Sequence, residues 1–130
     1  MLDDLKTLVE RLKAVSHPIR LRVLALLHSS ELSVCQVAEI LQVPQSSVSE
    51  ALRELRRAGF VSERKEGRWV FVSVIPGFEG DPLLKGILME ALRLPEVEAD
   101  RTRAGMVKGQ AIAVVCGKVQ AAETKEATRV

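Results

Sequence analysis

The residues best suited to chemistry in this chain are two cysteines, Cys35 and Cys116, which lie far apart in the sequence. Neither cysteine has a nearby ligand cluster, so the spacing excludes a zinc knuckle. The histidines His17 and His28 add little to the set of metal ligands. The chain also lacks a glycine-rich phosphate loop, a nucleophile elbow and a dyad at catalytic spacing. The sequence therefore predicts a protein that is not an enzyme.

Composition favours a small globular protein in a reducing compartment. The 130 residues are 47% hydrophobic and 28% charged, which suits one modest core. No apolar run approaches the roughly 18 residues that cross a membrane. The start Met1-Leu2-Asp3-Asp4 is unlike the basic start of a secretory signal. We expect a cytoplasmic protein with no membrane partner, in which the cysteines are reduced by default.

Apolar spacing and turn signals predict a mostly helical chain with one β-hairpin. A capping-box pattern, Ser33 followed by Gln36, marks the start of one short helix, and Gly59 stands where a helix commonly ends. β-branched and aromatic residues between Trp69 and Val74 indicate a strand. The expected helices span about 2–15, 18–29, 33–41, 45–58 and 82–95, and the expected strands span 60–64 and 68–74. Residues from Glu96 onward give no clear pattern.

This order of elements predicts a winged helix-turn-helix, in which the second helix of a tight pair enters the DNA major groove. Exposed positions early in that helix are short or polar, as expected for contacts to base edges and phosphates. Basic residues follow on the helix and around the hairpin turn, where a wing meets phosphates. The predicted DNA-binding residues are Gln45, Ser46, Ser47, Ser49, Glu50, Arg53, Arg64, Lys65 and Arg68.

Two observations weigh against this interpretation. The net charge is only +2, and a basic helix face taken alone is usually a solvated surface. Glu50 would repel phosphates, unless its carboxylate accepts a hydrogen bond from a cytosine amino group. The small polar helix start, the charged hairpin turn and the order of elements nevertheless agree with one another, and this agreement favours DNA binding.

Residues 16–24 and 31–74 resemble the ArsR/SmtB family of metal-responsive repressors. The resemblance extends over about residues 3–94 and is strongest in Q-S-S-V-S, L-R-x-A-G-F-V and E-G-R-W-V-F. It implies a homodimeric winged helix with the first and last helices at the dimer interface. It also implies a repressor that leaves double-stranded operator DNA when an effector binds. We therefore expect a DNA-binding and dimerisation domain at 1–95 and a C-terminal extension at 96–130.

The sequence departs from the family pattern in three places. Many members carry a basic or histidine pair where this chain has Glu50 and Ala51, so the operator sequence is not transferable. Arsenic-sensing members carry three cysteines at positions that match Ser33, Cys35 and Ala38, of which this chain keeps one. The zinc-type site of the last helix has no counterpart, because residues 82–94 contain no histidine and Glu90 as their single carboxylate.

Three interpretations of the cysteines remain open. Cys35 and Cys116 are packing and tail residues in the first. In the second they form a metal site for an effector, a trivalent arsenical or another soft metal ion, because such species prefer several thiolates. In the third they form a redox switch through thiol modification or a disulfide. The first turn of a helix favours the thiolate of Cys35, but this does not separate the last two. No obligatory cofactor is expected.

Overall fold

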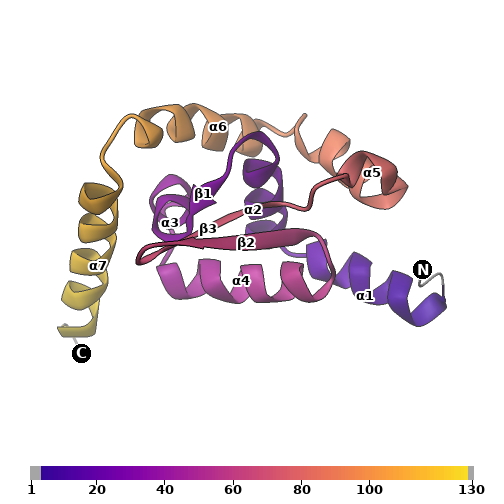
Figure 1. Cartoon of the computed structure of the whole chain (residues 1–130), viewed down its shortest axis with the longest axis horizontal. Coiled ribbons are helices and arrows are strands. Elements are labelled where there is room, and N and C mark those ends of the chain that lie inside the picture. The colour runs from indigo at the N-terminus through magenta and orange to yellow at the C-terminus, as the bar shows by residue number, and fades with distance from the viewer. Residues whose placement is uncertain (1–3, 129–130) are drawn as a thin grey trace.

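The structure is a computed structural model that describes residues 4–128, with side chains described from 4 to 122. Helices dominate this part of the chain, and three strands form one antiparallel sheet (Figure 1). The elements in order are α1 (Leu5–Val15), α2 (Pro18–Ser29), β1 (Leu32–Ser33), α3 (Val34–Leu41), α4 (Gln45–Arg57), β2 (Val61–Glu66), β3 (Trp69–Val74), the 3-10 turn η1 (Phe78–Gly80), α5 (Pro82–Ala91), α6 (Pro95–Lys108) and α7 (Ile112–Thr128).

Helices α3 and α4 form the tight pair that the sequence predicts. The hydroxyl of Ser33 accepts a hydrogen bond from the Gln36 backbone N–H at 3.2 Å, and the Gln36 side chain accepts one from the Ser33 N–H at 2.9 Å. This capping box fixes the first turn of α3. Gln42 then ends the helix in the left-handed region, with φ of 56°. Pro44 immediately precedes α4, so only a short turn separates the two helices.

The hairpin of β2 and β3 forms the wing. Glu66 pairs with Trp69 at the closed end of the hairpin. Gly67 in the turn adopts a φ of 59°, a conformation that residues with a side chain rarely adopt. The short strand β1 pairs with the far edge of β3, through Leu32 with Val72. Because β1 leads directly into α3, the sheet connects the wing to the start of the helix pair.

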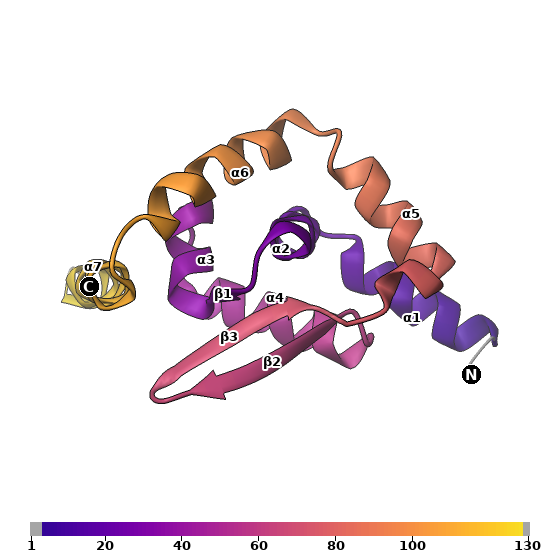
Figure 2. The ribbon, with the colours of Figure 1, turned by 45° about the horizontal axis from the view of Figure 1, so that its top comes forward.

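Helix α2 is the centre of the core. Figure 2 shows it surrounded by α3, α6, α5, α1 and the hairpin. Its five residues 23–27 are buried, and it packs against α4, α5 and α6. The N-terminal cap of α2 is His17, whose Nδ1 accepts a hydrogen bond from the Ile19 N–H at 3.2 Å. This nearly all-round burial explains why the apolar residues of α2 do not follow a single face.

The region without a clear sequence pattern folds into two helices. Helix α6 arches over α2 and α3, and α7 lies alongside α3 (Figure 2). Ala104, Val107, Val115 and Val119 are buried in the same core as the winged helix. The expected extension therefore adds side chains to the core of the preceding elements. Within residues 4–128, no helix combines the length and apolar character needed to span a bilayer.

Candidate DNA interface and cysteine pair

Helix α4 presents the predicted groove-reading residues on its outer face. Val48 and Leu55 on the opposite face are fully buried, and these contacts fix the helix on the core. The predicted DNA-binding residues Ser46, Ser49, Glu50 and Arg53 are exposed, whereas Gln45 and Ser47 are half-buried. The helix therefore displays short polar groups near its N-terminus and a guanidinium further along, which suits entry into a groove lined by phosphates.

The wing displays Arg64, Lys65 and Arg68, but these residues are not equivalent. Arg64 forms ion pairs with Glu31 at 2.7 Å and Glu66 at 3.3 Å. Its hydrogen bond lowers the pKa of the Glu31 carboxyl. In contrast, Lys65 and Arg68 form no ion pair with the residues that the structure describes. Arg64 is thus held by the protein itself, and the two residues nearer the turn are better placed for phosphates.

Glu50 faces a different part of the molecule from the wing. It lines a pocket of about 180 Å³ with Ser47, His17 and Arg20. Arg20 lines the same pocket, so a basic side chain lies on the same part of the surface as this carboxylate. Glu50 of α4 therefore lies beside the start of α2, away from the basic residues of the wing.

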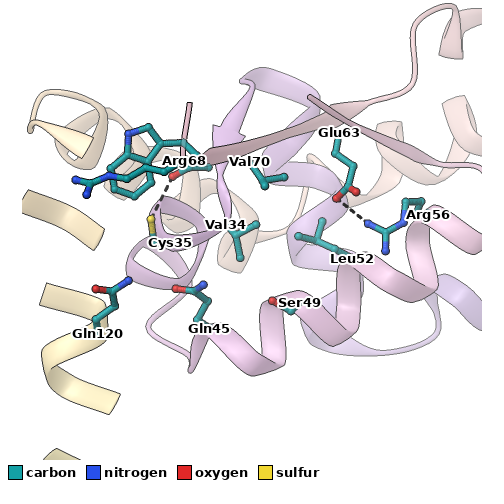
Figure 3. Close-up of a pocket in the computed structure, with 12 residues that line it drawn as sticks. Val34, Cys35, Gln45, Ser49, Leu52, Arg56, Glu63, Arg68, Val70 and Gln120 are labelled. Atoms are coloured by element: carbon teal, nitrogen blue, oxygen red, sulfur yellow. Dashed lines mark hydrogen bonds and ion pairs between the residues drawn. The ribbon is translucent and has the colours of Figure 1, made fainter. Parts of the chain in front are cut away.

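Sequence reasoning missed one residue that fixes the wing against α4. Arg56 forms an ion pair with Glu63 of β2 at 2.7 Å (Figure 3). Arg56 was visible as part of a basic run, but a sequence pattern does not identify a partner on another element. Both side chains are about half exposed, so the pair contributes orientation more than stability.

The two cysteines, far apart in the sequence, are joined in the structure. Cys35 lies in the first turn of α3 and Cys116 in α7, and they form a disulfide with a Cα–Cα distance of 5.2 Å. They are 6% and 2% exposed. The Ser33 hydroxyl lies 3.5 Å from the Cys35 Sγ. Among the described residues, no group of three or more His, Cys, Asp or Glu side chains is placed to hold a metal ion.

One cavity connects Cys35 with the candidate DNA interface. It measures about 450 Å³ and lies between α3, α4, the wing and α7 (Figure 3). Cys35 forms part of its wall, and so do Gln45, Ser49 and Arg68, three of the predicted DNA-binding residues. Gln120 of α7 points toward Gln45 across it. Sequence reasoning did not identify Gln120, because no pattern indicated that the C-terminal region returns to this place.

Helix α7 packs mainly against one other helix. Its main packing partner is α3. Val115, Cys116 and Val119 are its buried side chains among residues 112–122. The disulfide to Cys35 adds a covalent restraint to this packing.

A tight helix pair, an exposed polar helix and a basic hairpin together define a winged helix-turn-helix protein of the DNA-binding class. Residues 17–63 match the family model described as "Bacterial regulatory protein, arsR family".

Relatives agree with this match. The chain is 31% identical to the arsenic resistance transcriptional regulator ArsR1 of Pseudomonas putida, over 65% of this chain and 75% of that protein. It is 38% identical to a transcriptional repressor SmtB homolog of Synechocystis, over 56% of this chain and 55% of that protein. Reduced HlyU from Vibrio cholerae superposes with a TM-score of 0.59 and 33% identity, over 69% of this chain and 90% of that chain. The chain belongs to the ArsR/SmtB family of transcriptional repressors, which are DNA-binding regulators and not enzymes.

Proposed function

We propose that this chain is a cytoplasmic homodimeric repressor whose affinity for operator DNA depends on the redox state of Cys35 and Cys116. The reduced protein binds the operator, and the disulfide form releases it. The observation that carries this proposal is the disulfide between Cys35 and Cys116, in which Cys35 also lines a cavity together with Gln45, Ser49 and Arg68. A chemical change at the sulfur atoms therefore occurs beside the DNA-binding surface.

The DNA contacts divide between α4 and the wing. The start of α4 enters the major groove, where Gln45, Ser46 and Ser49 contact base edges or phosphates. The cationic groups of Arg53, Lys65 and Arg68 contact phosphates, with Arg64, Ser47 and Glu50 at the border of the contact surface. Each phosphate contact adds to the salt dependence of binding.

Dimerisation involves the outer face of α1. Leu5, Leu8 and Leu12 form an apolar stripe on this helix, and they are 79%, 46% and 43% exposed. An apolar stripe of this kind marks an interaction surface. Arg11 of α1 pairs with Asp81 at the start of α5, which fixes the two helices together. Helix α1 lies at the opposite end of the molecule from α7 (Figure 1), so a dimer through α1 leaves the cysteine pair unobstructed.

Oxidation requires a two-electron oxidant, for which a peroxide is the probe. One thiolate attacks the peroxide oxygen, forms a sulfenic acid and releases water. The second thiol then attacks that sulfur, forms the Cys35–Cys116 disulfide and releases a second water. Two thiols are oxidised and one peroxide is reduced to two waters. Exchange with a small thiol restores the reduced pair.

A trivalent arsenical is the second candidate effector, and the same sulfur pair supports it. An arsenical with one organic group reacts with two thiols and releases two waters from its hydrated form, so Cys35 and Cys116 satisfy it. Inorganic arsenite favours a third soft ligand, and the described residues offer none near the pair. An arsenic resistance regulator is among the relatives, which favours testing this class. Either effector joins the same two residues.

Fluorescence anisotropy on the DNA upstream of the gene tests the proposal. We expect reduced wild type to bind this DNA more tightly than a random duplex, and peroxide to weaken specific binding until a thiol is added. Phenylarsine oxide tests the second candidate in the same titration. Cys35→Ser and Cys116→Ser should bind DNA and respond to neither reagent. Equal affinity of reduced and oxidised wild type would contradict redox control, and equal affinity for both duplexes would contradict operator binding.

A further inference from the structure

The disulfide places α7 beside the first turn of the recognition helix. Gln120 lies one helical turn after Cys116, so both residues project from the same side of α7. Cys116 bonds to α3, and Gln120 points toward Gln45, the first residue of α4 (Figure 3). The wing residues Arg68 and Trp69 line the same cavity. Helix α7 therefore stands where α4 begins and where the wing turns.

The part of α7 after Cys116 also extends toward the DNA side. In Figure 1, its last turns reach beyond the level of α4, whose outer face carries Ser46 and Arg53. The major groove of B-DNA is about 12 Å wide and admits one helix, which itself measures about 10–12 Å across. A second helix beside the start of α4 competes for space with the sugar-phosphate backbone that borders the groove.

We infer that α7 is a steric gate, tethered by the Cys35–Cys116 disulfide over the DNA-binding surface. In the oxidised chain, α7 blocks the approach of DNA to Gln45 and Arg68. In the reduced chain, α7 loses its covalent anchor and moves away, and the start of α4 becomes accessible. This inference rests on the proposed redox control and specifies how it works: the blocking element is the segment after Cys116, not a shift of α3.

A helix-breaking substitution in full-length protein separates these two mechanisms. Gln120→Pro interrupts α7 one turn after the disulfide, because proline lacks an N–H and clashes with the preceding turn. Gln120→Ala is the matched control, since it removes the same side chain and preserves the helix. Each variant is oxidised, and free thiols are titrated to verify that the disulfide is complete. Operator binding is then measured for the oxidised and reduced forms.

We expect oxidised Gln120→Pro to bind the operator at least about tenfold more tightly than oxidised wild type, and oxidised Gln120→Ala to remain as weak as wild type. All reduced forms should bind alike. Equal weakness of oxidised Gln120→Pro and wild type overturns the gate but leaves redox control intact. Equal recovery in both variants also overturns it, because the block then belongs to one side chain. Absence of any redox effect in wild type contradicts the proposed function itself.

A second measurement does not depend on the proline variant. Trp69 is the only tryptophan of the chain and shares the cavity with Gln120. Release of α7 should increase quenching of its fluorescence by acrylamide. We expect reduction to raise the quenching constant of wild type to the value measured for Cys116→Ser, which should not respond to reductant. An unchanged quenching constant in wild type would show that α7 does not leave, and would overturn the gate.

Discussion

Helices α6 and α7 both follow the winged helix in sequence, but they are attached to it in different ways. Asp100 of α6 accepts two hydrogen bonds from the Arg22 guanidinium of α2, at 2.8 and 2.9 Å. Val97, Ala104 and Val107 of the same helix are buried. Among residues 112–122 of α7, the disulfide is joined by the buried side chains of Val115 and Val119. We therefore expect α6 to be a permanent part of the fold in both redox states, and α7 to be conditional on its one reducible bond.

Hydrogen exchange tests most directly whether α6 and α7 differ in their dependence on the disulfide. Reduction of the disulfide should increase amide exchange in α7 by about a hundredfold or more, because its local unfolding then costs little free energy. Exchange in α6 should remain unchanged. Mass spectrometry of peptides from each helix, before and after reduction, checks this. Protection of α7 that survives reduction would mean that noncovalent contacts hold both helices.

Substitution of Asp100 tests the permanent attachment. Asp100→Asn keeps the size of the side chain but leaves part of the Arg22 guanidinium without an acceptor. Asp100 is 6% exposed and Arg22 is 30% exposed, so the loss is smaller than for a fully buried pair. We expect the free energy of unfolding to fall by about 2 kcal/mol in both redox states. Urea denaturation measures it, and a loss confined to the oxidised protein would contradict a redox-independent role for α6.

One buried valine on each helix can be substituted to compare how the two helices contribute to stability in the two redox states. Val107 of α6 and Val119 of α7 are 4% and 7% exposed. Val107→Ala should lower the free energy of unfolding by about 1–2 kcal/mol in both redox states, because it leaves a cavity in a packed core. Val119→Ala should have a similar effect only while the disulfide is present. Urea denaturation of the four samples distinguishes these outcomes, and equal losses in reduced protein would show that Val119 stays buried.

Local signals in the sequence were sufficient for the winged helix and insufficient for α7. The Ser33–Gln36 capping box, the Gly59 and Gly67 turns and the β-branched and aromatic run of β3 act over a few residues, so each predicts its element directly. The contact between Cys35 and Cys116 instead depends on the path of α6 over the core. Two cysteines permitted a disulfide, a metalloid site or simple packing, and only the fold brings their sulfur atoms together.

The candidate DNA interface was predictable in position and less so in detail. Ser46, Ser49 and Glu50 are exposed, as the sequence pattern predicts, because amphipathic spacing determines which face points outward. Gln45 and Ser47, which were also expected to be exposed, are half-buried. Pairing on the wing was not predictable. Arg64 is held by Glu31, which lies before the helix pair in sequence, while Lys65 beside it has no ion pair among the described residues. A charge pattern identifies a basic hairpin but not which cations remain available.

The smallest expected effect is a pH dependence of stability that arises from His28, which lies near α6. His28 of α2 lies against the Phe78 ring, and its Nδ1 is buried without a hydrogen-bond partner among the described residues. Burial lowers the pKa of His28, the positive charge of Arg101 on α6 lowers it further, and Glu79 acts in the opposite direction. Protonation therefore favours the unfolded chain, and the stability that His28 contributes above its ordinary pKa of about 6.5 is lost as the pH falls below that value.

Lowering the pH from 7.5 to 5.5 should thus reduce the free energy of unfolding by a modest amount in both redox states. His28→Gln should remove most of this pH dependence, because the replacement does not titrate. Arg101→Gln should reduce it only in part, since burial is the larger cause. Urea denaturation at the two pH values measures all three proteins. If this pH dependence disappeared on reduction, the environment of His28 would depend on the disulfide. That result would contradict the expectation that α6 stays in place in both redox states.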